Sequence, residues 1–411
     1  MISILLIGTC DTKAEEILFL KSCLEESGAR VVVMDVGVMG TPHFQPDYSN
    51  ADVALAGGST IEAISKLSDE NEAMARMAKG AAALARRLHE EGEIQGMVAL
   101  GGTMGTDLAL EVASALPLGV PKVVVSTVAF SHLIPAERIP ADLTMMLWPG
   151  GLYGLNSICR PVLAQAAGAV VGAARATIRV TRERPMIGIT SLGKSCLSYM
   201  VALKPELERR GYEVAVFHST GMGGRAFESL AEQGRFAAVL DLCLQELSNE
   251  LAGSVVTAGR SRLEAAGRAG IPQIVAPGAT DMVDFQAWKS IDGRYRDRPF
   301  HAHNRLVASV TTSVEDRVRL ARTIGEKLSL SRGAVKFVLP LRGVEQWDRP
   351  GEALHDPEGL RAFVCEMRRS VRAPVELVEV DAHINDAAFT DAVLRIFDEW
   401  VASEVVAAGV T

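Results

Sequence analysis

The chain lacks several features that mark simple classes of protein. Its six cysteines are dispersed along 411 residues and include no C-x-x-C pair, which argues against a zinc knuckle and a redox dithiol. No basic segment followed by an apolar stretch opens the sequence, so we expect no signal peptide. The formal net charge of -8 is opposite to what nucleic acids and membrane surfaces attract. We therefore expect a cytoplasmic protein with reduced cysteines and with neither nucleic acid nor membrane as a partner.

The sequence also lacks an apolar run long enough to span a membrane. Residues 161–178 are rich in alanine and glycine, but Gln165 and Arg175 interrupt them. We expect a tightly packed buried helix there.

The chain does contain a regular alternation of β-branched apolar runs and helical patterns. Strands are predicted first at 2–7, 31–35, 97–100 and 122–126, with helices at 12–27, 59–66, 71–91 and 106–115. Charge and proline follow at 181–185, and the alternation restarts with strands near 186–190, 213–217, 237–240, 273–276, 335–339 and 375–380. This pattern predicts two α/β domains, residues 1–181 and 182–411, each with a mostly parallel β-sheet covered by helices on both faces.

Two of the predicted strands end in glycine and hydroxyl residues that precede a predicted helix. The two loops are Gly8-Thr9-Cys10-Asp11-Thr12-Lys13 and Gly101-Gly102-Thr103-Met104-Gly105-Thr106. Their order places backbone N–H groups and the positive end of a helix dipole where a phosphate could bind. Open α/β sheets bind ligands outside the carboxyl ends of their strands, where Ser126 and Thr127 of the next strand would add hydroxyl groups. The two loops therefore suggest a nucleotide site.

Several residues of this site have a structural alternative. Thr12 and Glu15 match a T-x-x-E capping box, so Thr12 could cap a helix. Lys13 opposes the helix dipole unless an anion or a carboxylate lies near, and Asp11 could be that carboxylate. Asp35 ends the second predicted strand, where dinucleotide-binding folds place a ribose-binding acid, but a turn aspartate before Gly37 is an equal alternative.

A literal P-loop pattern, G-x-x-x-x-G-K-S, occupies residues 188–195 and ends in Gly193, Lys194 and Ser195. Asp241 could then be the strand-end acid that holds magnesium. The strand predicted at 186–190 leaves too few residues for a loop around phosphates, so we keep this only as an alternative phosphate site.

Three further groups of polar residues follow predicted strands or lie in loops of the second half. The first group lies before a helix expected from residue 226 and consists of His218, Gly221, Gly223, Gly224 and Arg225. It could bind a carboxylate or phosphate of a substrate, and a structural turn is the alternative. A long turn-rich stretch contains Asp281, Asp284, His301, His303 and Asn304, whose histidines could bind a metal although spacing fixes no third ligand. The last strand is followed by His383, Asn385 and Asp386, and Asn385 or Asp386 should cap the final helix.

Seven phrases resemble the Tm-1-like ATP-binding family, also called UPF0261, in order along nearly the whole chain. They are GTCDTK (8–13), LGGTMGT (100–106), VSTVA (125–129), GLNS (154–157), GMGGR (221–225), LEAAG (263–267) and HIND (383–386). The resemblance implies two Rossmann-like domains and a cytoplasmic homo-oligomer, a dimer or a tetramer. It makes the loops at 8–13 and 101–106 an ATP site on the first domain. The chain departs from the family's usual GGSGGT at Thr103-Met104, and residues 130–135 replace an SGD-type stretch.

These features favour an ATP-dependent enzyme of small-molecule metabolism that uses Mg²⁺ and binds its substrate between the two domains. Lys13 would neutralise phosphate, Thr12 or Thr106 would bind Mg²⁺, and Arg225 would hold a substrate anion. Two alternatives stay open. One is a non-catalytic module gated by a nucleotide, favoured because no catalytic constellation stands out. The other is a metal-assisted hydrolase or lyase that uses His301 and His303.

Overall fold

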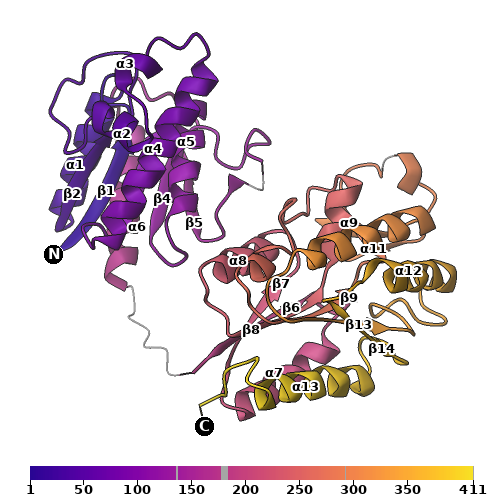
Figure 1. Ribbon diagram of the computed structural model, residues 1–411. Helices are drawn as coiled ribbons and strands as arrows, with labels where there is room; N and C mark the ends of the chain where they lie inside the picture. The colour runs from indigo at the N-terminus through magenta and orange to yellow at the C-terminus, as the bar shows by residue number, and fades with distance from the viewer. Residues whose placement is uncertain (136–137, 177–183, 292, 411) are drawn as a thin grey trace. The chain divides into compact units, whose positions relative to one another are not determined.

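The structure, a computed structural model, describes residues 1–135, 138–176, 184–291 and 293–410. It divides into two units, Met1–Val180 and Thr181–Thr411 (Figure 1). The boundary predicted between residues 181 and 182 lies outside the described residues.

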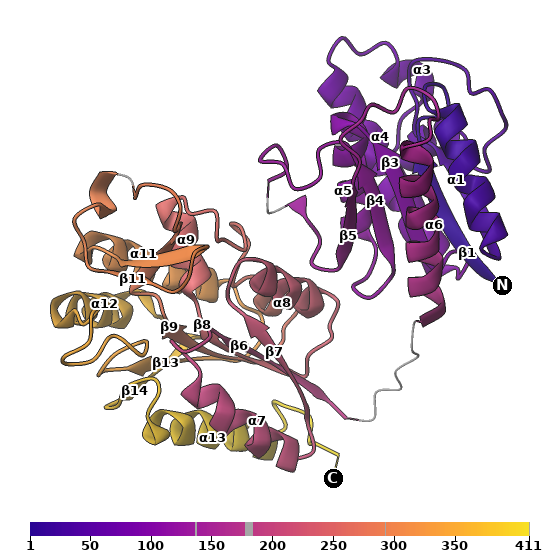
Figure 2. The ribbon, with the colours of Figure 1, turned by 180° about the vertical axis from the view of Figure 1, so that it is seen from behind.

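The first unit contains a five-stranded parallel sheet with the order β2-β1-β3-β4-β5. Its strands are β1 (Ile2–Gly8), β2 (Ala29–Asp35), β3 (Gly96–Gly101), β4 (Lys122–Ser126) and β5 (Leu143–Leu147). One face is covered by α1 (Ala14–Glu26) and α6 (Cys159–Ala176), as Figure 2 shows from behind. The other face is covered by α2 (Asn50–Ala56), α3 (Ile61–Ile64), α4 (Glu70–Glu90) and α5 (Thr103–Ala115).

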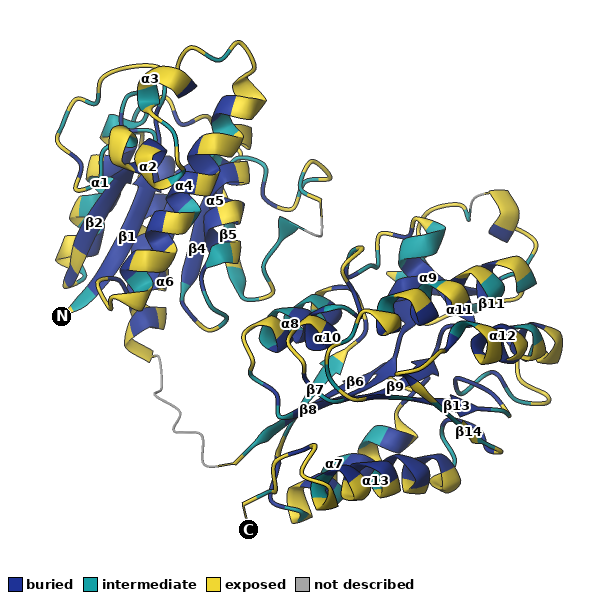
Figure 3. Ribbon diagram, in the orientation of Figure 1, coloured by how far each residue is buried: buried dark blue, intermediate teal, exposed yellow. Residues whose placement is uncertain are grey.

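Neighbouring residues of β1 contribute to both cores of this unit. Leu5 and Ile7 pack with the α2 to α5 side, whereas Ile4 and Leu6 pack with the α1 and α6 side. Side chains alternate between the faces of a strand, so a strand covered on both faces must be apolar throughout. Figure 3 accordingly shows the inner strands buried, the edge strand β5 partly exposed, and helices that expose their outer sides.

The second unit contains a six-stranded parallel sheet with the order β14-β13-β9-β8-β6-β7. Its strands are β6 (Met186–Ser191), β7 (Glu213–His218), β8 (Ala238–Cys243), β9 (Gln273–Gly278), β13 (Val335–Pro340) and β14 (Glu376–Val380). Helices α7 (Ser198–Arg209) and α13 (Ala387–Ala402) cover one face (Figure 1). The other carries α8 (Met222–Glu232), α9 (Gln245–Ala252), α10 (Ala265–Arg268), α11 (Val314–Ser329) and α12 (Pro357–Ser370).

The predicted fold class, α/β with two Rossmann-like domains built on parallel sheets, is confirmed. The turn-rich stretch expected to be a loop instead forms a three-stranded antiparallel sheet with the order β10-β12-β11. Its strands are β10 (Met282–Gln286), β11 (Phe300–Ala302) and β12 (Val307–Thr311), with a short 3₁₀ turn, η2 (Gly293–Tyr295), between the first two. These strands are short and were not distinguished from turns by hydrophobic periodicity.

The helix predicted at 161–178 corresponds to α6, and its last two residues lie outside the described part of the chain. It packs in the core through residues such as Leu163, Val170 and Val171, so the expected buried helix is present, although it is buried along one side and exposes the other. Across the described ranges, we find no helix with both the length and the apolar character that crossing a membrane requires.

Candidate functional site

A pocket of about 720 Å³ lies in the first unit at the carboxyl ends of β1 and β3. The strand order reverses between β1 and β3, and open α/β sheets bind ligands in the crevice at such a switch point. The residues of the two loops that line the pocket are Gly8, Thr9, Asp11, Thr12, Lys13, Gly101, Gly102, Thr103 and Gly105. The structure therefore brings the two glycine- and threonine-containing loops to one cavity.

The first loop ends at the N-terminus of α1, where the capping box expected from Thr12 and Glu15 does not form. Lys13 is the N-cap residue, and no side chain caps the helix. Thr12 instead shares a 2.8 Å hydrogen bond with the Thr9 hydroxyl. The prediction was wrong because the Thr9 carbonyl accepts from the amides of Thr12 and Lys13, which delays the helix by one residue. The first backbone N–H groups of α1 are thus not used by a cap.

Asp11, which the sequence offered as a possible partner of Lys13, binds backbone amides instead. Asp11 accepts hydrogen bonds of 3.0 Å from the amides of Met39 and Gly40, and so ties the first loop to the segment after β2. The Lys13 ammonium lies 4.8 Å from the centroid of the Tyr153 ring, which is 92% exposed. Both side chains line the pocket.

The second loop turns sharply into α5, which begins at Thr103 rather than at Thr106 as predicted. A Cβ atom on Gly101 would lie 2.6 Å from the Gly105 Cα, so only glycine permits this close turn. Gly102 is the N-cap residue, and no side chain caps this helix either. Two uncapped helix N-termini therefore meet at one pocket, the arrangement that favours an anion.

Four residues predicted for the site do not line this pocket: Asp35, Thr106, Ser126 and Thr127. Thr106 and Ser126 are buried, and their hydroxyls share a 2.7 Å hydrogen bond, which removes Thr106 from the expected Mg²⁺ role. Thr127 stands beside the second loop, where its amide donates to the Gly101 carbonyl. At these strand ends the hydroxyl groups satisfy the chain's own polar atoms.

Asp35 takes the structural alternative, a buried aspartate that holds a turn. Its Oδ1 accepts from the amides of Cys10 and Gly37 at 2.9 Å each. Burial raises the pKa of Asp35 above its ordinary value, and burial together with the Asp35 charge raises the pKa of the Cys10 thiol. The ribose-binding role expected for Asp35 was wrong because the carboxylate lies beneath the first loop.

An apolar wall of the pocket was missed by reasoning from the sequence. It consists of Val36, Val38, Met39, Met74 and Leu108. The one available signal was the apolar character of residues 36–39 directly after β2, because α4 and α5 supply the others through packing.

The P-loop pattern at residues 188–195 does not form a phosphate-binding loop. Strand β6 continues through Ser191, and α7 begins only at Ser198. Lys194 is exposed, whereas Ser195 is buried and its carbonyl accepts from the Gln346 amide. The alternative phosphate site at Gly193, Lys194 and Ser195 was therefore wrong, because the strand uses the first half of the motif.

The second predicted anion site is closed by a carboxylate of the chain itself. Helix α8 begins at Met222, earlier than expected, and the amides of Gly221 and Gly224 donate to Glu246 Oε1 at 2.6 and 3.1 Å. A Cβ atom on Gly224 would fall 2.0 Å from Glu246 Oε2. Of the remaining members of this predicted site, His218 is exposed, Gly223 lies within α8 and Arg225 donates to the Thr257 carbonyl. An external anion was the wrong prediction, because Glu246 already occupies that position.

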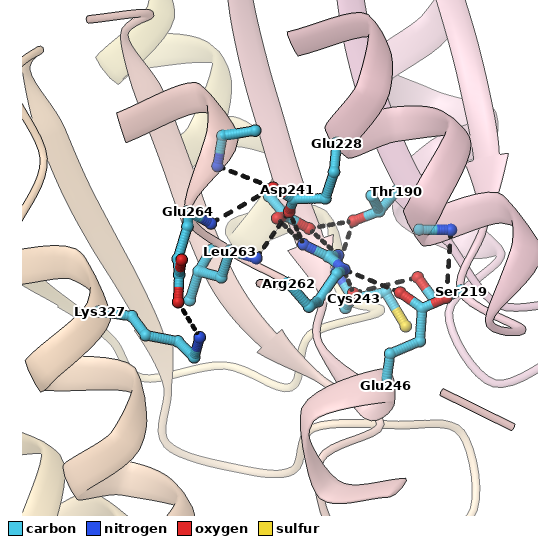
Figure 4. Close-up of polar contacts among 12 residues, drawn as sticks. Thr190, Ser219, Glu228, Asp241, Cys243, Glu246, Arg262, Leu263, Glu264 and Lys327 are labelled. Atoms are coloured by element: carbon cyan, nitrogen blue, oxygen red, sulfur yellow. Dashed lines mark hydrogen bonds and ion pairs between the residues drawn. The ribbon is translucent and has the colours of Figure 1, made fainter. Parts of the chain in front are cut away.

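Glu246 belongs to a buried network around Arg262 (Figure 4). Arg262 donates to Asp241 at 2.5 and 2.6 Å, to Glu246 at 2.8 Å and to Glu228 at 3.2 Å. Thr190 on β6 also donates to Asp241 on β8, at 2.8 Å. The order of the second sheet reverses between these two strands, so its switch point is filled by ion pairs of the protein. Asp241 is therefore an ion-pair partner and not the magnesium-binding acid of a P-loop.

The histidines of the turn-rich stretch contact one another and neighbouring side chains. Ser309 on β12 lies opposite Asp284 on β10 and donates to it at 2.5 Å, and His303 Nε2 lies 3.0 Å from the Ser309 hydroxyl. The His301 and His303 rings pack against Trp347. Within the described ranges, no group of three or more His, Cys, Asp or Glu residues could hold a metal ion. Asn304 accepts from the amides of residues 306 and 307, as expected of a turn residue.

The last strand leads into α13 through a loop whose polar residues bind neighbouring loops. Asp386 is the N-cap residue, as predicted, although its carboxylate binds the His383 amide and Arg349 instead of the helix. His383 Nε2 lies 2.8 Å from the Glu345 carbonyl, and Asn385 donates to the Ser195 carbonyl at 2.8 Å. Burial lowers the pKa of His383, which fits a neutral imidazole that donates to that carbonyl.

Comparison with known proteins identifies the family. Models of the N-terminal and C-terminal domains of UPF0261, an uncharacterised protein family, match residues 2–179 and 184–401. A UPF0261 protein of Brucella melitensis biotype 1 is 56% identical over 406 residues, which cover 99% of this chain and 97% of that protein. A UPF0261 protein of Clostridium tetani is 38% identical and covers 95% of this chain and 97% of its own length. The chain belongs to the UPF0261 family.

One plant relative also matches nearly the whole chain, whereas the solved structures resemble it only weakly. The ToMV resistance protein Tm-1(GCR237) of Solanum lycopersicum is 30% identical over 426 residues, which cover 96% of this chain and 55% of that protein. A structure of S. aureus MnaA with UDP is 11% identical, covers 67% of this chain and 79% of its own, and has a TM-score of 0.19. A likeness of that size carries no argument about function.

Proposed function

We propose that the first unit binds ATP together with Mg²⁺ in the pocket between the loops at 8–13 and 101–105. The observation that carries this proposal is the meeting of two uncapped helix N-termini and one lysine at the switch point of a parallel sheet. Each helix N-terminus contributes about half a positive charge, and Lys13 adds a full one. The pocket therefore suits a ligand with several negative charges, such as a triphosphate.

The shape of the pocket supports a nucleotide over a bare anion. Its volume of about 720 Å³ falls in the range of small-molecule and cofactor sites. The phosphates would lie over the N-termini of α1 and α5, with the Thr9 and Thr12 hydroxyls available to Mg²⁺. The base would lie against the apolar wall of Val38, Met39 and Met74, with Tyr153 at its side. The family resemblance stated from the sequence implies the same ligand.

The activity that this arrangement fits best is an ATP-dependent reaction of small-molecule metabolism. Phosphoryl transfer relies on positioning and charge neutralisation, which backbone amides, a lysine and Mg²⁺ can supply. A cytoplasmic homo-oligomer and the substrate itself remain predictions.

The test is the melting temperature of the purified full-length protein with ATP, with and without Mg²⁺. A ligand that binds only the folded state stabilises it by about 2.7 kcal/mol at one hundred times its Kd. Lys13→Ala should weaken ATP binding at least about tenfold, because a hydrogen bond to a charged group contributes roughly 1.5–3 kcal/mol.

Lys21→Ala is the matched control, because Lys21 lies on the same helix, pairs with Glu25 at 3.9 Å and does not line the pocket. It should bind ATP like the parent protein. No melting shift with ATP and Mg²⁺, or equal ATP binding by Lys13→Ala and the parent, would overturn the proposal.

A further inference from the structure

Buried polar atoms without hydrogen-bond partners gather at one edge of the second sheet. They are Ser195 Oγ, Gln245 Oε1, Asn249 Nδ2, both carboxyl oxygens of Asp281 and of Glu345, and Asn385 Oδ1, together with the nitrogens Arg317 Nε, Arg349 Nε and His355 Nδ1. Ser195 follows β6, Gln245 and Asn249 follow β8, Asp281 follows β9, Glu345 follows β13 and Asn385 follows β14. Parallel strands end at the same edge, so five loops bring these atoms to the ligand-binding side of the sheet.

Hydrogen bonds between the loops place these residues in one cluster. The Ala279 amide donates to the Val344 carbonyl at 2.9 Å, which joins the loops after β9 and β13. The Ser195 carbonyl accepts from the Gln346 amide at 2.9 Å and from Asn385 Nδ2 at 2.8 Å, which adds the loops after β6 and β14. In α9, Ser248 donates to the carbonyl of residue 280 at 2.8 Å, which adds the loop after β8.

Such a concentration of unpaired atoms needs an explanation. Leaving one buried polar group without a partner costs about 1–3 kcal/mol, and folded proteins contain only a few such groups. Ser195, Gln245, Asn249, Asp281 and Glu345 are each at most 1% exposed. Their partner therefore comes from outside the chain.

The unpaired atoms are mostly hydrogen-bond acceptors. Gln245 donates to Asp284 at 2.9 Å, which fixes its amide and leaves Oε1 without a donor. Asn249 Oδ1 accepts from the Asp284 amide at 2.8 Å, which leaves its NH₂ as the one amide donor. With the oxygens of Asp281, Glu345 and Asn385, the unpaired acceptors at the cluster outnumber the unpaired donors, which also include Arg317 Nε and Arg349 Nε. A protonated amine, which donates three hydrogen bonds and accepts none, matches this set better than a neutral polyol.

The charged groups around Asp281 and Glu345 also favour a positively charged ligand. Burial and the neighbouring charge of Asp348 raise the pKa of Asp281, and burial and the charge of Asp281 raise the pKa of Glu345. Arg317 opposes both pKa shifts, and the Trp347 amide also opposes that of Glu345. Arg317 pairs with Asp356 at 3.1 Å, and its Nε has no partner. The other titratable or charged groups at the cluster are Cys196, next to Cys243, the histidines 355 and 383, and Arg349, which pairs with Asp386 at 3.0 Å. Acidic groups therefore outnumber cations, and no metal-binding set is present in the described ranges.

We propose that this edge of the second unit, centred on Asp281 and Glu345, binds a small molecule through its protonated amino group. The two carboxyl groups hold the ammonium ion, while Gln245 and Ser195 bind polar groups next to it. Because burial raises the pKa of both carboxyl groups and a bound ammonium ion favours their ionised forms, binding releases protons. Both carboxyl groups are buried, so binding requires the loops around them to open locally. Local opening is feasible because single hydrogen bonds, and no strand ladder, join these loops to one another. The site is independent of the ATP pocket of the first unit.

Matched pairs of amines and alcohols test the proposal on the full-length protein. We would measure melting temperature and binding heat with 1,4-diaminobutane against 1,4-butanediol, and with glucosamine against glucose. The amines should raise the melting temperature and the alcohols should not. Diaminobutane should bind more tightly as the pH rises from about 6 to about 8, by up to tenfold per pH unit for each proton released.

Two isosteric variants make the test specific. Asp281→Asn and Glu345→Gln should fold, because each amide keeps the shape of the side chain and burial already disfavours the charged carboxylate. Each should weaken amine binding at least about tenfold. Asp381→Asn is the control, an exposed residue of the same unit that pairs with Arg342. The proposal is overturned if amine and alcohol shift the melting temperature equally, or if no amine shifts it. It is also overturned if both isosteric variants bind amines like the parent, or if Mg²⁺ or Ca²⁺ gives the shift in place of the amines.

Discussion

Replacing Arg262 with methionine perturbs the buried ion network at the switch point of the second sheet. Methionine fills much of the volume of the arginine stem but removes every guanidinium donor to Asp241, Glu246 and Glu228. Glu246 and Glu228 keep backbone donors at the N-termini of α8 and α10, whereas Asp241 keeps only the Thr190 hydroxyl. Removing one partner of a buried ion pair costs about 3–5 kcal/mol, so we expect Arg262→Met to lower the free energy of unfolding by that amount.

Urea denaturation of the full-length protein, followed by tryptophan fluorescence, measures this loss. Trp288, Trp347 and Trp400 lie in the second unit, so the signal reports mainly on it. Arg268→Met is the matched control, because Arg268 forms exposed ion pairs with Glu232 and Glu264, which contribute only about 0–1 kcal/mol.

A second substitution locates the cause of the loss. In the Arg262→Met protein, Asp241→Asn should recover about 1–3 kcal/mol, because the neutral amide no longer leaves a buried charge and still accepts from Thr190. Glu228→Gln should recover less, because Glu228 keeps its backbone donors. If Arg262→Met is no more destabilising than Arg268→Met, or if Asp241→Asn deepens the loss, the network does not hold this edge together.

Three shorter predictions concern the two ligand sites and the packing of glycine. Gly102→Asp should weaken ATP binding at least about tenfold, because it adds a carboxylate at the N-terminus of α5, whereas Gly102→Asn should leave ATP binding unchanged. Calorimetry that finds the same loss of ATP affinity in both variants would contradict the electrostatic argument. The melting temperature of the second unit should fall as the pH rises from about 5 to about 8. Asp281 and Glu345 have raised pKa values in the folded state, so the stability that they contribute at acidic pH is lost as the pH rises. Asp281→Asn should therefore make the melting temperature depend less on pH. Gly172→Ala in α6 should add about 0.5–1 kcal/mol to the free energy of urea unfolding of the first unit, because a Cβ atom there meets no atom within 4 Å. Gly80→Ala should reduce this free energy, because its Cβ atom would lie 2.0 Å from the Val53 carbonyl oxygen.

The first pocket could be located from the sequence because its parts follow from strand order. The loops after Gly8 and Gly101 each come directly after an apolar strand, and parallel strands place their carboxyl ends together. The details inside the loop could not be found in the same way. Whether Thr12 caps α1 depends on a turn at the Thr9 carbonyl, which a T-x-x-E pattern does not specify.

The second unit was harder to predict because its decisive contacts are long-range. Glu246 reaches the amide of Gly221, which lies 25 positions earlier in the chain, and Arg262 reaches Asp241 across 21 positions. No local pattern shows which carboxylate will occupy a helix N-terminus. Glu345 could have been proposed from the sequence, since it follows a predicted strand, by the same reasoning that located the first pocket.

The two parallel sheets share a topology but carry opposite chemistry at their edges. In the order β2-β1-β3-β4-β5 the switch point is open, with two helix N-termini uncapped, so it offers hydrogen-bond donors and positive charge. In the order β7-β6-β8-β9-β13-β14 the same position is closed by Arg262 and Glu246, and Glu246 takes the place of an anion. The unpaired buried atoms in the loops of this edge are mainly acceptors, with Asp281 after β9 and Glu345 after β13 among them. A repeated fold therefore does not imply a repeated ligand, because the first edge offers hydrogen-bond donors and positive charge, whereas the second offers mainly acceptors and carboxyl groups.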